Sequence, residues 1–141
     1  MNTLKKAGTI CGAIAFLLMP LASVIIIVSW FYGWTVDKSD TVPAMSLVII
    51  SIMSAIILFL AVVDIISFVF FTISAKNRIK ALGIISESIG LLSNLLFSGL
   101  YLFICHSSEL YRTMTIIYFA VTAVLHVISL LSANLPEKIN E

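Results

Sequence analysis

Long, uninterrupted apolar runs dominate the chain, and polar residues fall mainly between them. The runs cover about residues 8–34, 44–74, 82–105 and 112–133. Each reaches or exceeds the roughly 20 residues that a helix needs to cross a bilayer core. A segment in lipid must satisfy its own backbone hydrogen bonds, and none of the runs shows the polar–apolar alternation of a barrel strand. The pattern predicts an all-α integral membrane protein with four spans.

The connections between the runs are short, with "TVDKSDTVP", "AKNRIKA" and "HSSELY" at their centres. Short connections make consecutive helices antiparallel neighbours. We therefore expect a single membrane domain, residues 1–141, folded as an up-down-up-down four-helix bundle. The run 44–74 would form a helix of ~46 Å, which predicts that it tilts or projects from the bilayer at one end.

The composition agrees with this pattern. The chain is 61% hydrophobic and 11% charged, whereas a soluble domain carries roughly a quarter charged residues. There is too little polar surface for a water-exposed globule. The few basic residues lie where membrane topology already accounts for them, so no nucleic-acid partner is expected.

Basic residues concentrate on one predicted side of the membrane. The positive-inside rule makes that side cytoplasmic and places both termini there. Aromatic residues fall near the opposite interface, where amphipathic rings prefer to lie. We expect a multi-pass protein of the cell membrane. The basic residues on the predicted inner side are Lys5, Lys6, Lys76, Arg78, Lys80 and Lys138, and the outer aromatic residues are Trp30, Tyr32, Trp34, Tyr101 and Tyr111.

One acid interrupts the apolar stretch "FLAVVDIISFVFF". A carboxylate at the centre of a spanning helix costs about 3 kcal/mol on insertion, so Asp64 is expected to face protein and a partner. Counted from the cytoplasmic helix ends, Asp64 lies ~15 Å deep, Asn94 ~18 Å and His126 ~12 Å, with Glu87 nearer the surface at ~8 Å. Three helices thus offer polar groups in one layer.

Helical spacing places small and polar residues on shared faces, as expected where a spanning helix meets protein instead of lipid. The faces comprise Gly83, Glu87, Gly90 and Asn94 on the third helix, Thr115, Tyr118, Thr122, His126 and Ser129 on the fourth, and Ser54, Ile57, Ala61 and Asp64 on the second. Gly8 and Gly12 form a GxxxG pattern, which predicts close helix packing within the bundle or between chains.

The polar layer has two interpretations. Asp64 and His126 could form a proton relay or cation site with Glu87 as the next station, or the layer could only hold the helices together by hydrogen bonds of about 0.6 kcal/mol each. Glu87, two helical turns beyond Lys80, is interpreted mainly as an interfacial anchor near "KNRIK". Asp64→Leu should lower the melting temperature if Asp64 holds helices together, and be neutral or stabilising otherwise.

No motif of an enzyme is recognised: the chain has no activated nucleophile and no phosphate or nucleotide signature. Cys105, His106 and Glu109 lack a fourth metal ligand and are interpreted as interfacial residues. Cys11 and Cys105 lie near opposite membrane faces and cannot pair within one chain. We expect no catalysis, metal or cofactor.

Two functions remain open. The preferred hypothesis is an accessory, immunity-type or partner-binding subunit that meets another membrane protein or further copies of itself in the lipid bilayer. The alternative is an oligomeric transporter or channel subunit that uses the polar layer of Asp64, Asn94 and His126. No known family is recognised in the sequence.

Overall fold

The chain forms four long helices joined by short connections. A computed structural model describes residues 3–36, 44–104 and 108–134. All four helices are long and apolar enough to cross a membrane, which confirms the expected all-α fold and agrees with a multi-pass membrane protein. The helices are α1 (Thr3–Val36), α2 (Ala44–Asn77), α3 (Lys80–Ile104) and α4 (Glu109–Ala133).

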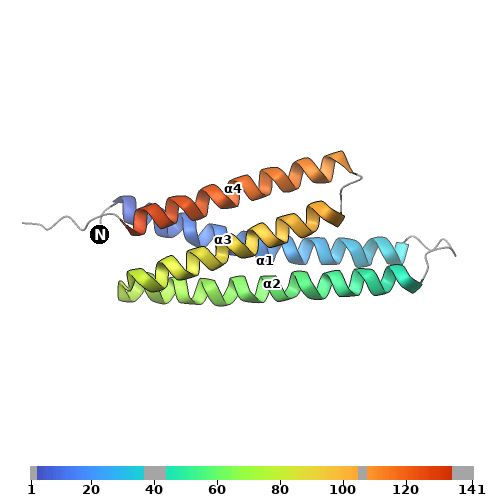
Figure 1. The fold of residues 1–141 in the computed structure, drawn as a ribbon, viewed down its shortest axis with the longest axis horizontal. Helices are drawn as coiled ribbons and strands as arrows, with labels where there is room; N and C mark the ends of the chain where they lie inside the picture. Colours follow the sequence, from blue (N-terminus) through green and yellow to red (C-terminus); the bar gives the residue numbers. More distant parts are fainter. Residues whose placement is uncertain (1–2, 37–43, 105–107, 135–141) are drawn as a thin grey trace, which may run out of the picture.

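The four helices lie side by side along one long axis (Figure 1). α1 packs against α2 and α4, and α3 packs against the same two helices from the other side, while α1 and α3 barely touch. Each helix therefore has two close neighbours, as in a four-helix bundle. Pro20 lies inside α1 without ending that helix.

The interior of the bundle is more polar than its exterior. Polar residues outnumber apolar ones among the buried positions, whereas leucine, isoleucine, valine and phenylalanine side chains cover the outside. Lipid tails are as apolar as leucine, so burying leucine inside the bundle gains little, and small polar residues can occupy the interior instead. The buried polar residues with single-digit exposure are Ser23, Ser54, Asp64, Ser67, Ser74, Ser86, Glu87, Ser93, Asn94, Ser98, Thr115, Thr122, His126, Ser129 and Ser132.

Most buried hydroxyl groups are satisfied within their own helix. Ser23 donates to the Met19 carbonyl at 2.8 Å, and Ser67 donates to the Val63 carbonyl at 2.9 Å. Such bonds to the preceding turn let a serine enter an apolar helix without a partner on another helix. Small side chains then allow the helices to approach closely.

The four glycines expected at helix contacts all lie at contacts inside this one chain. Gly8 lies against Ser132 of α4, and Gly83 lies against Ser74 of α2. Gly12 lies against Ser129 of α4, and Gly90 lies against α1 and α4. The GxxxG pattern of α1 therefore packs α1 onto α4 within the bundle, which is the first of the two alternatives that the sequence left open.

A two-residue turn joins α2 to α3. Arg78 adopts a positive φ of 58°, a left-handed conformation that costs a non-glycine residue about 1 kcal/mol. The Ser74 hydroxyl donates to the Ile79 carbonyl at 2.7 Å, and the Ile79 amide donates to the Ser74 carbonyl at 3.2 Å. These bonds close the turn and fix α3 beside α2 at the end of the bundle nearest the candidate site.

At the far end from this turn, α1 and α2 extend past the ends of α3 and α4 (Figure 1). α2 has 34 residues and ends at this turn, whereas α3 has 25 residues and starts from it. About nine residues of α2 therefore project by ~13 Å beyond α3. We call residues 31–36 and 44–52 the α1–α2 extension.

An apolar cluster lies between the extension and the opposite end of the bundle. Met19 of α1, Ile57 and Leu60 of α2 and Phe97 of α3 pack together at the centre of the bundle. Toward the extension, the rings of Trp30 and Tyr101 stack at 6.2 Å between centroids, which marks the level at which α3 ends.

Candidate functional site

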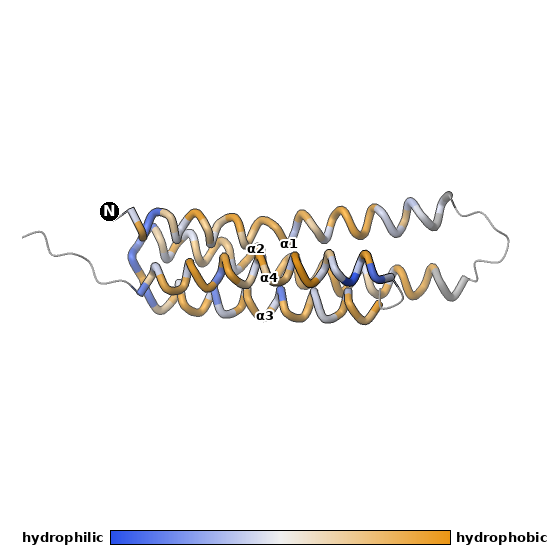
Figure 2. Tube along the Cα trace, turned by 90° about the horizontal axis from the view of Figure 1, so that it is seen from above, coloured by the Kyte–Doolittle hydropathy of each residue, from blue (hydrophilic) through white to orange (hydrophobic). Residues whose placement is uncertain are grey.

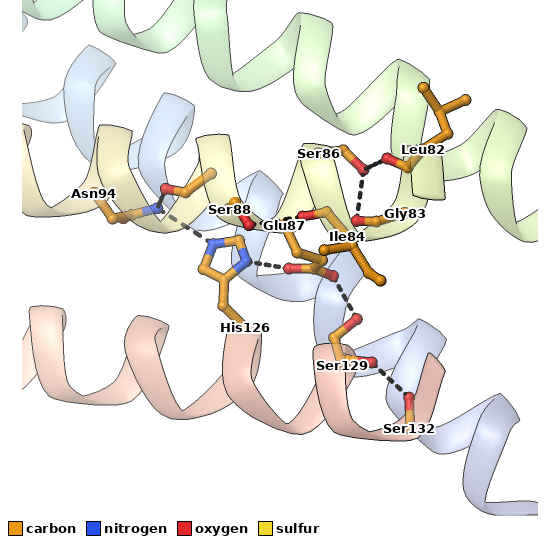
Figure 3. Close-up of polar contacts among 11 residues, drawn as sticks. Leu82, Gly83, Ile84, Ser86, Glu87, Ser88, Asn94, His126, Ser129 and Ser132 are labelled. Atoms are coloured by element: carbon orange, nitrogen blue, oxygen red, sulfur yellow. Dashed lines mark hydrogen bonds and ion pairs between the residues drawn. The ribbon is translucent and has the colours of Figure 1, made fainter. Parts of the chain in front are cut away.

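A chain of polar side chains runs along the α3–α4 contact (Figure 3). Glu87 and Asn94 are seven residues apart on α3 and share a face, while His126 and Ser129 are three apart on α4. All four are buried. Gly90, between the two α3 residues, leaves the space that the His126 ring occupies, because an added Cβ there would lie 2.8 Å from His126 Cε1.

Glu87 accepts hydrogen bonds at both carboxylate oxygens. Its Oε2 lies 2.5 Å from His126 Nδ1, and its Oε1 accepts a hydrogen bond from the Ser129 hydroxyl. The residue is only 3% exposed. Glu87 therefore points into the bundle, and the interpretation as an interfacial anchor near the basic turn is wrong. The physical reason is that Glu87 shares the small-residue face of α3, so α4 lies closer to its carboxylate than the turn does.

Asn94 fixes the direction of the hydrogen bonds around His126. The Asn94 side-chain amide nitrogen donates to the Gly90 carbonyl at 3.0 Å and lies 3.3 Å from His126 Nε2. Its oxygen accepts from the Tyr118 hydroxyl at 3.0 Å. Because the amide nitrogen must face a carbonyl, it is also a donor toward His126, so Nε2 accepts and Nδ1 carries the proton. The hydrogen bonds that run from Asn94 through His126, and the bond from Ser129, therefore all lead to the Glu87 carboxylate.

Phe16 of α1, supported by Phe71 of α2, holds the His126 ring in place. Phe16 meets the imidazole edge-on, with centroids 4.8 Å apart, and Phe71 of α2 packs on Phe16 at 5.4 Å. Edge-to-face rings of this kind add up to about 1.5 kcal/mol beyond their buried area. Gly12 of α1 leaves room for the Glu87 carboxylate beside these rings, because a Cβ at position 12 would lie 2.7 Å from Glu87 Oε1.

Asp64 stands apart from this chain. Its side chain is fully buried on α2, and neither carboxylate oxygen has a hydrogen-bond partner among the described residues. The expected polar layer is therefore divided: Asn94 and His126 are in contact, whereas no hydrogen bond within the described residues joins Asp64 to either. The Asn94 amide also stands between His126 and Tyr118, and an amide group does not readily take up a proton. The described contacts thus provide no direct relay from Asp64 to His126.

A shallow groove on the α3–α4 side brings the Glu87–His126 pair nearest to the outside of the bundle. The two polar side chains contribute little to its walls, which are mainly aliphatic. Its lining residues are Glu87, Ser88, Leu91, His126, Val127 and Leu130.

Sequence reasoning placed Tyr118 and Ser129 on the interior face of α4 but gave them no role. Their spacing of eight and three residues from His126 on one helical face was the available signal. Phe16 lacked any such signal, because one phenylalanine in an apolar run looks like its neighbours.

No metal centre is formed within residues 3–36, 44–104 and 108–134, where no three histidine, cysteine, aspartate or glutamate side chains gather. Cys105 and His106 lie outside the described residues. Cys11 is a half-buried free thiol in α1.

Asp64→Leu should leave the melting temperature in detergent unchanged or raise it. The substitution breaks no described hydrogen bond and removes a desolvated acid. Asn94→Leu is the matched control, because it breaks the bonds to Tyr118, His126 and Gly90 and should lower the melting temperature. If Asp64→Leu unfolded the protein as readily as Asn94→Leu, Asp64 would have a structural partner.

Comparison with known proteins finds no protein-family model that matches the chain, and neither a curated protein nor a solved structure is similar to it.

Proposed function

We propose that the protein is a small membrane subunit that acts by binding another membrane protein, as an accessory or immunity-type partner. The observation that carries this proposal is the α1–α2 extension. It is an apolar helix pair that continues beyond the point where α3 and α4 stop (Figure 1).

The lengths of the shorter helices make the extension unusual. A helix of 25 residues, such as α3 or α4, is ~37 Å long and already exceeds the roughly 30 Å hydrocarbon core. With α3 and α4 centred in that core, the extension reaches the headgroup region or beyond. Val48, Ile49 and Ile52 are about half exposed there. Lipid tails do not cover apolar side chains at that level, so a contiguous apolar surface there indicates a protein contact.

An up-down-up-down topology with both termini in the cytoplasm is part of this proposal. The two-residue connection between α2 and α3 supports antiparallel neighbours. The start of α1 and the turn between α2 and α3 lie at the same end of the bundle (Figure 1), where Figure 2 shows hydrophilic segments in blue. These segments carry Lys5, Lys6, Lys76 and Lys80, so this end is the cytoplasmic one by the positive-inside rule. The extension then lies on the outer side of what we propose is the cell membrane.

The proposed partners follow from these surfaces. The exposed aliphatic sides of all four helices meet lipid, and the basic end is suited to anionic headgroups. The extension binds a second membrane protein or another copy of this chain. Neither catalysis nor nucleic-acid binding is part of the proposal.

Ile49→Glu should reduce recovery of a co-purified membrane protein, or of the oligomer, at least tenfold. A charge in the centre of an apolar contact typically removes 1.4 kcal/mol or more of binding energy, which corresponds to a factor of ten. The measurement is native mass spectrometry of protein solubilised gently from its own membrane.

Leu110→Glu is the matched control. Leu110 is exposed in the first turn of α4, at the same end of the bundle but outside the extension. It should leave the complex intact. Equal loss in both variants would show that a charge at this end acts through insertion or general stability, and wild-type protein that is strictly monomeric in its native membrane would contradict the proposal.

A second candidate is an oligomeric transporter or channel subunit. The specific observation in its favour is the pair of buried acids, Asp64 and Glu87, together with the buried side chains of His126 and Asn94. The apolar cluster around Met19 and Phe97 fills the bundle centre, so a path would run between protomers. Ion flux into proteoliposomes that is lost in Asp64→Asn would favour this candidate over the accessory function.

A further inference from the structure

We propose that Asp64 is a proton-binding site, at which the buried carboxyl group holds a proton as a neutral acid. The inference concerns the isolated bundle and does not rest on the partner-binding proposal.

The two carboxyl groups have opposite surroundings. Glu87 receives hydrogen bonds from His126 and Ser129, and donors of this kind stabilise an ionised carboxylate. Asp64 is 0% exposed, and both of its oxygens lack a donor within the described part of the chain. An unpaired ionised group in such an interior is strongly unfavourable, because burial removes its hydration without a compensating partner.

Three interior donors, the Tyr118 hydroxyl, the Asn94 amide and the Ser67 hydroxyl, are already engaged with other groups. The Tyr118 hydroxyl donates to Asn94, and both hydrogens of the Asn94 amide are used by Gly90 and His126. Ser67, one turn away on α2, donates to its own helix. None of these groups turns toward Asp64 without giving up a bond that the structure shows.

The titratable groups on the neighbouring helices also favour the neutral form of Asp64. Asp64 lies within electrostatic range of Glu87 on α3 and Tyr118 on α4, and His126 of α4 already donates its Nδ1 proton to Glu87. The buried residues of α1, which include Ala15, Phe16, Met19 and Ser23, have no titratable side chains. No described cation faces Asp64 from the bundle interior, and the nearby negative charge opposes a second anion.

A proton fits this position better than a metal ion. Hard cations require several oxygen ligands around them. Around Asp64 the described residues gather no group of three acidic, histidine or cysteine side chains. A proton needs only one carboxylate oxygen and converts the acid into a neutral group that the apolar surroundings tolerate.

Infrared spectroscopy of the purified protein tests this inference. At neutral pH the wild type should show the carbonyl stretching band of a protonated carboxylic acid, and incorporation of ¹³C-labelled aspartate should shift it. The chain has two other aspartates, Asp37 and Asp40, which fall between the first two spans in the sequence, and the Asp64→Asn variant separates their contribution from that of Asp64. Asp64→Asn should abolish the band, and Glu87→Gln, the matched control, should retain it.

Three results would overturn the inference. They are the absence of such a band from wild-type protein, a band that persists in Asp64→Asn, and loss of the band when sodium is added at constant pH. The last result would identify Asp64 as a metal-cation ligand. The isotope shift is measured in the wild type, so the test holds even where a variant folds poorly.

Discussion

Glu87→Ala should lower the free energy of unfolding by about 3 kcal/mol. Removal of one member of a buried, hydrogen-bonded pair leaves its partners unsatisfied, and such changes cost about 3–5 kcal/mol in proteins. Here the His126 Nδ1 proton and the Ser129 hydroxyl both lose their acceptor. A space also opens beside Gly12. The loss is measured as a lower melting temperature in detergent, or as unfolding at a lower denaturant concentration.

Glu109→Ala provides the matched control, because Glu109 is exposed in the first turn of α4. It should change stability by about 0.5 kcal/mol, the usual size of a charge effect at a helix N-terminus. Similar losses in the two variants would mean that the buried network contributes no more than an exposed charge, and the hydrogen-bond assignment of His126 would then need revision.

Gly90→Ala should destabilise the bundle by about 1–3 kcal/mol, the usual cost of overpacking a filled interior. The added methyl group would lie 2.5 Å from Phe16 Cε1 and 2.8 Å from His126 Cε1. Both rings are fixed by neighbours, because Phe16 packs against Phe71 and His126 is hydrogen-bonded at both nitrogens. Thermal unfolding of the purified protein measures the effect.

Gly99→Ala on the same helix should have the opposite sign. Nothing lies within 4 Å of a Cβ built at Gly99, so the change should stabilise α3 by up to about 1 kcal/mol through helix propensity alone. Equal changes at the two glycines would show that propensity, and not the contact with Phe16 and His126, determines the result at Gly90.

The sequence predicted the helices and their interior faces well, because both depend on periodicity along one helix. The face with Gly83, Glu87, Gly90 and Asn94 is buried in the structure. Helix ends were less accurate: α1 begins at Thr3 and includes Lys5 and Lys6, because a helix continues into the interfacial region where charges are tolerated. An apolar run therefore underestimates the length of such a helix.

The partners within the polar layer could not be predicted in the same way. Counting residues gives depth along the axis, but hydrogen bonding also depends on how each helix is rotated. Asp64 and Asn94 were placed at similar depths, yet Asn94 is bonded to Gly90, Tyr118 and His126 instead. Because Asn94 is engaged by these three residues, it is not bonded to Asp64, which has no partner among the described residues. Sequence spacing does not determine which of the two residues is bonded.

The hydroxyl groups that bond within their own helices have a consequence for how the protein assembles. Spanning helices insert separately and then associate, and Ser23, Ser67 and Thr122 enter the bilayer with their hydrogen bonds already made. The carboxylate of Glu87 and the ring of His126 are satisfied only when α3 meets α4. During biogenesis the Glu87–His126 pair therefore favours one alignment of α3 against α4. A slip of one helical turn between the two helices would leave both groups without hydrogen-bond partners in lipid.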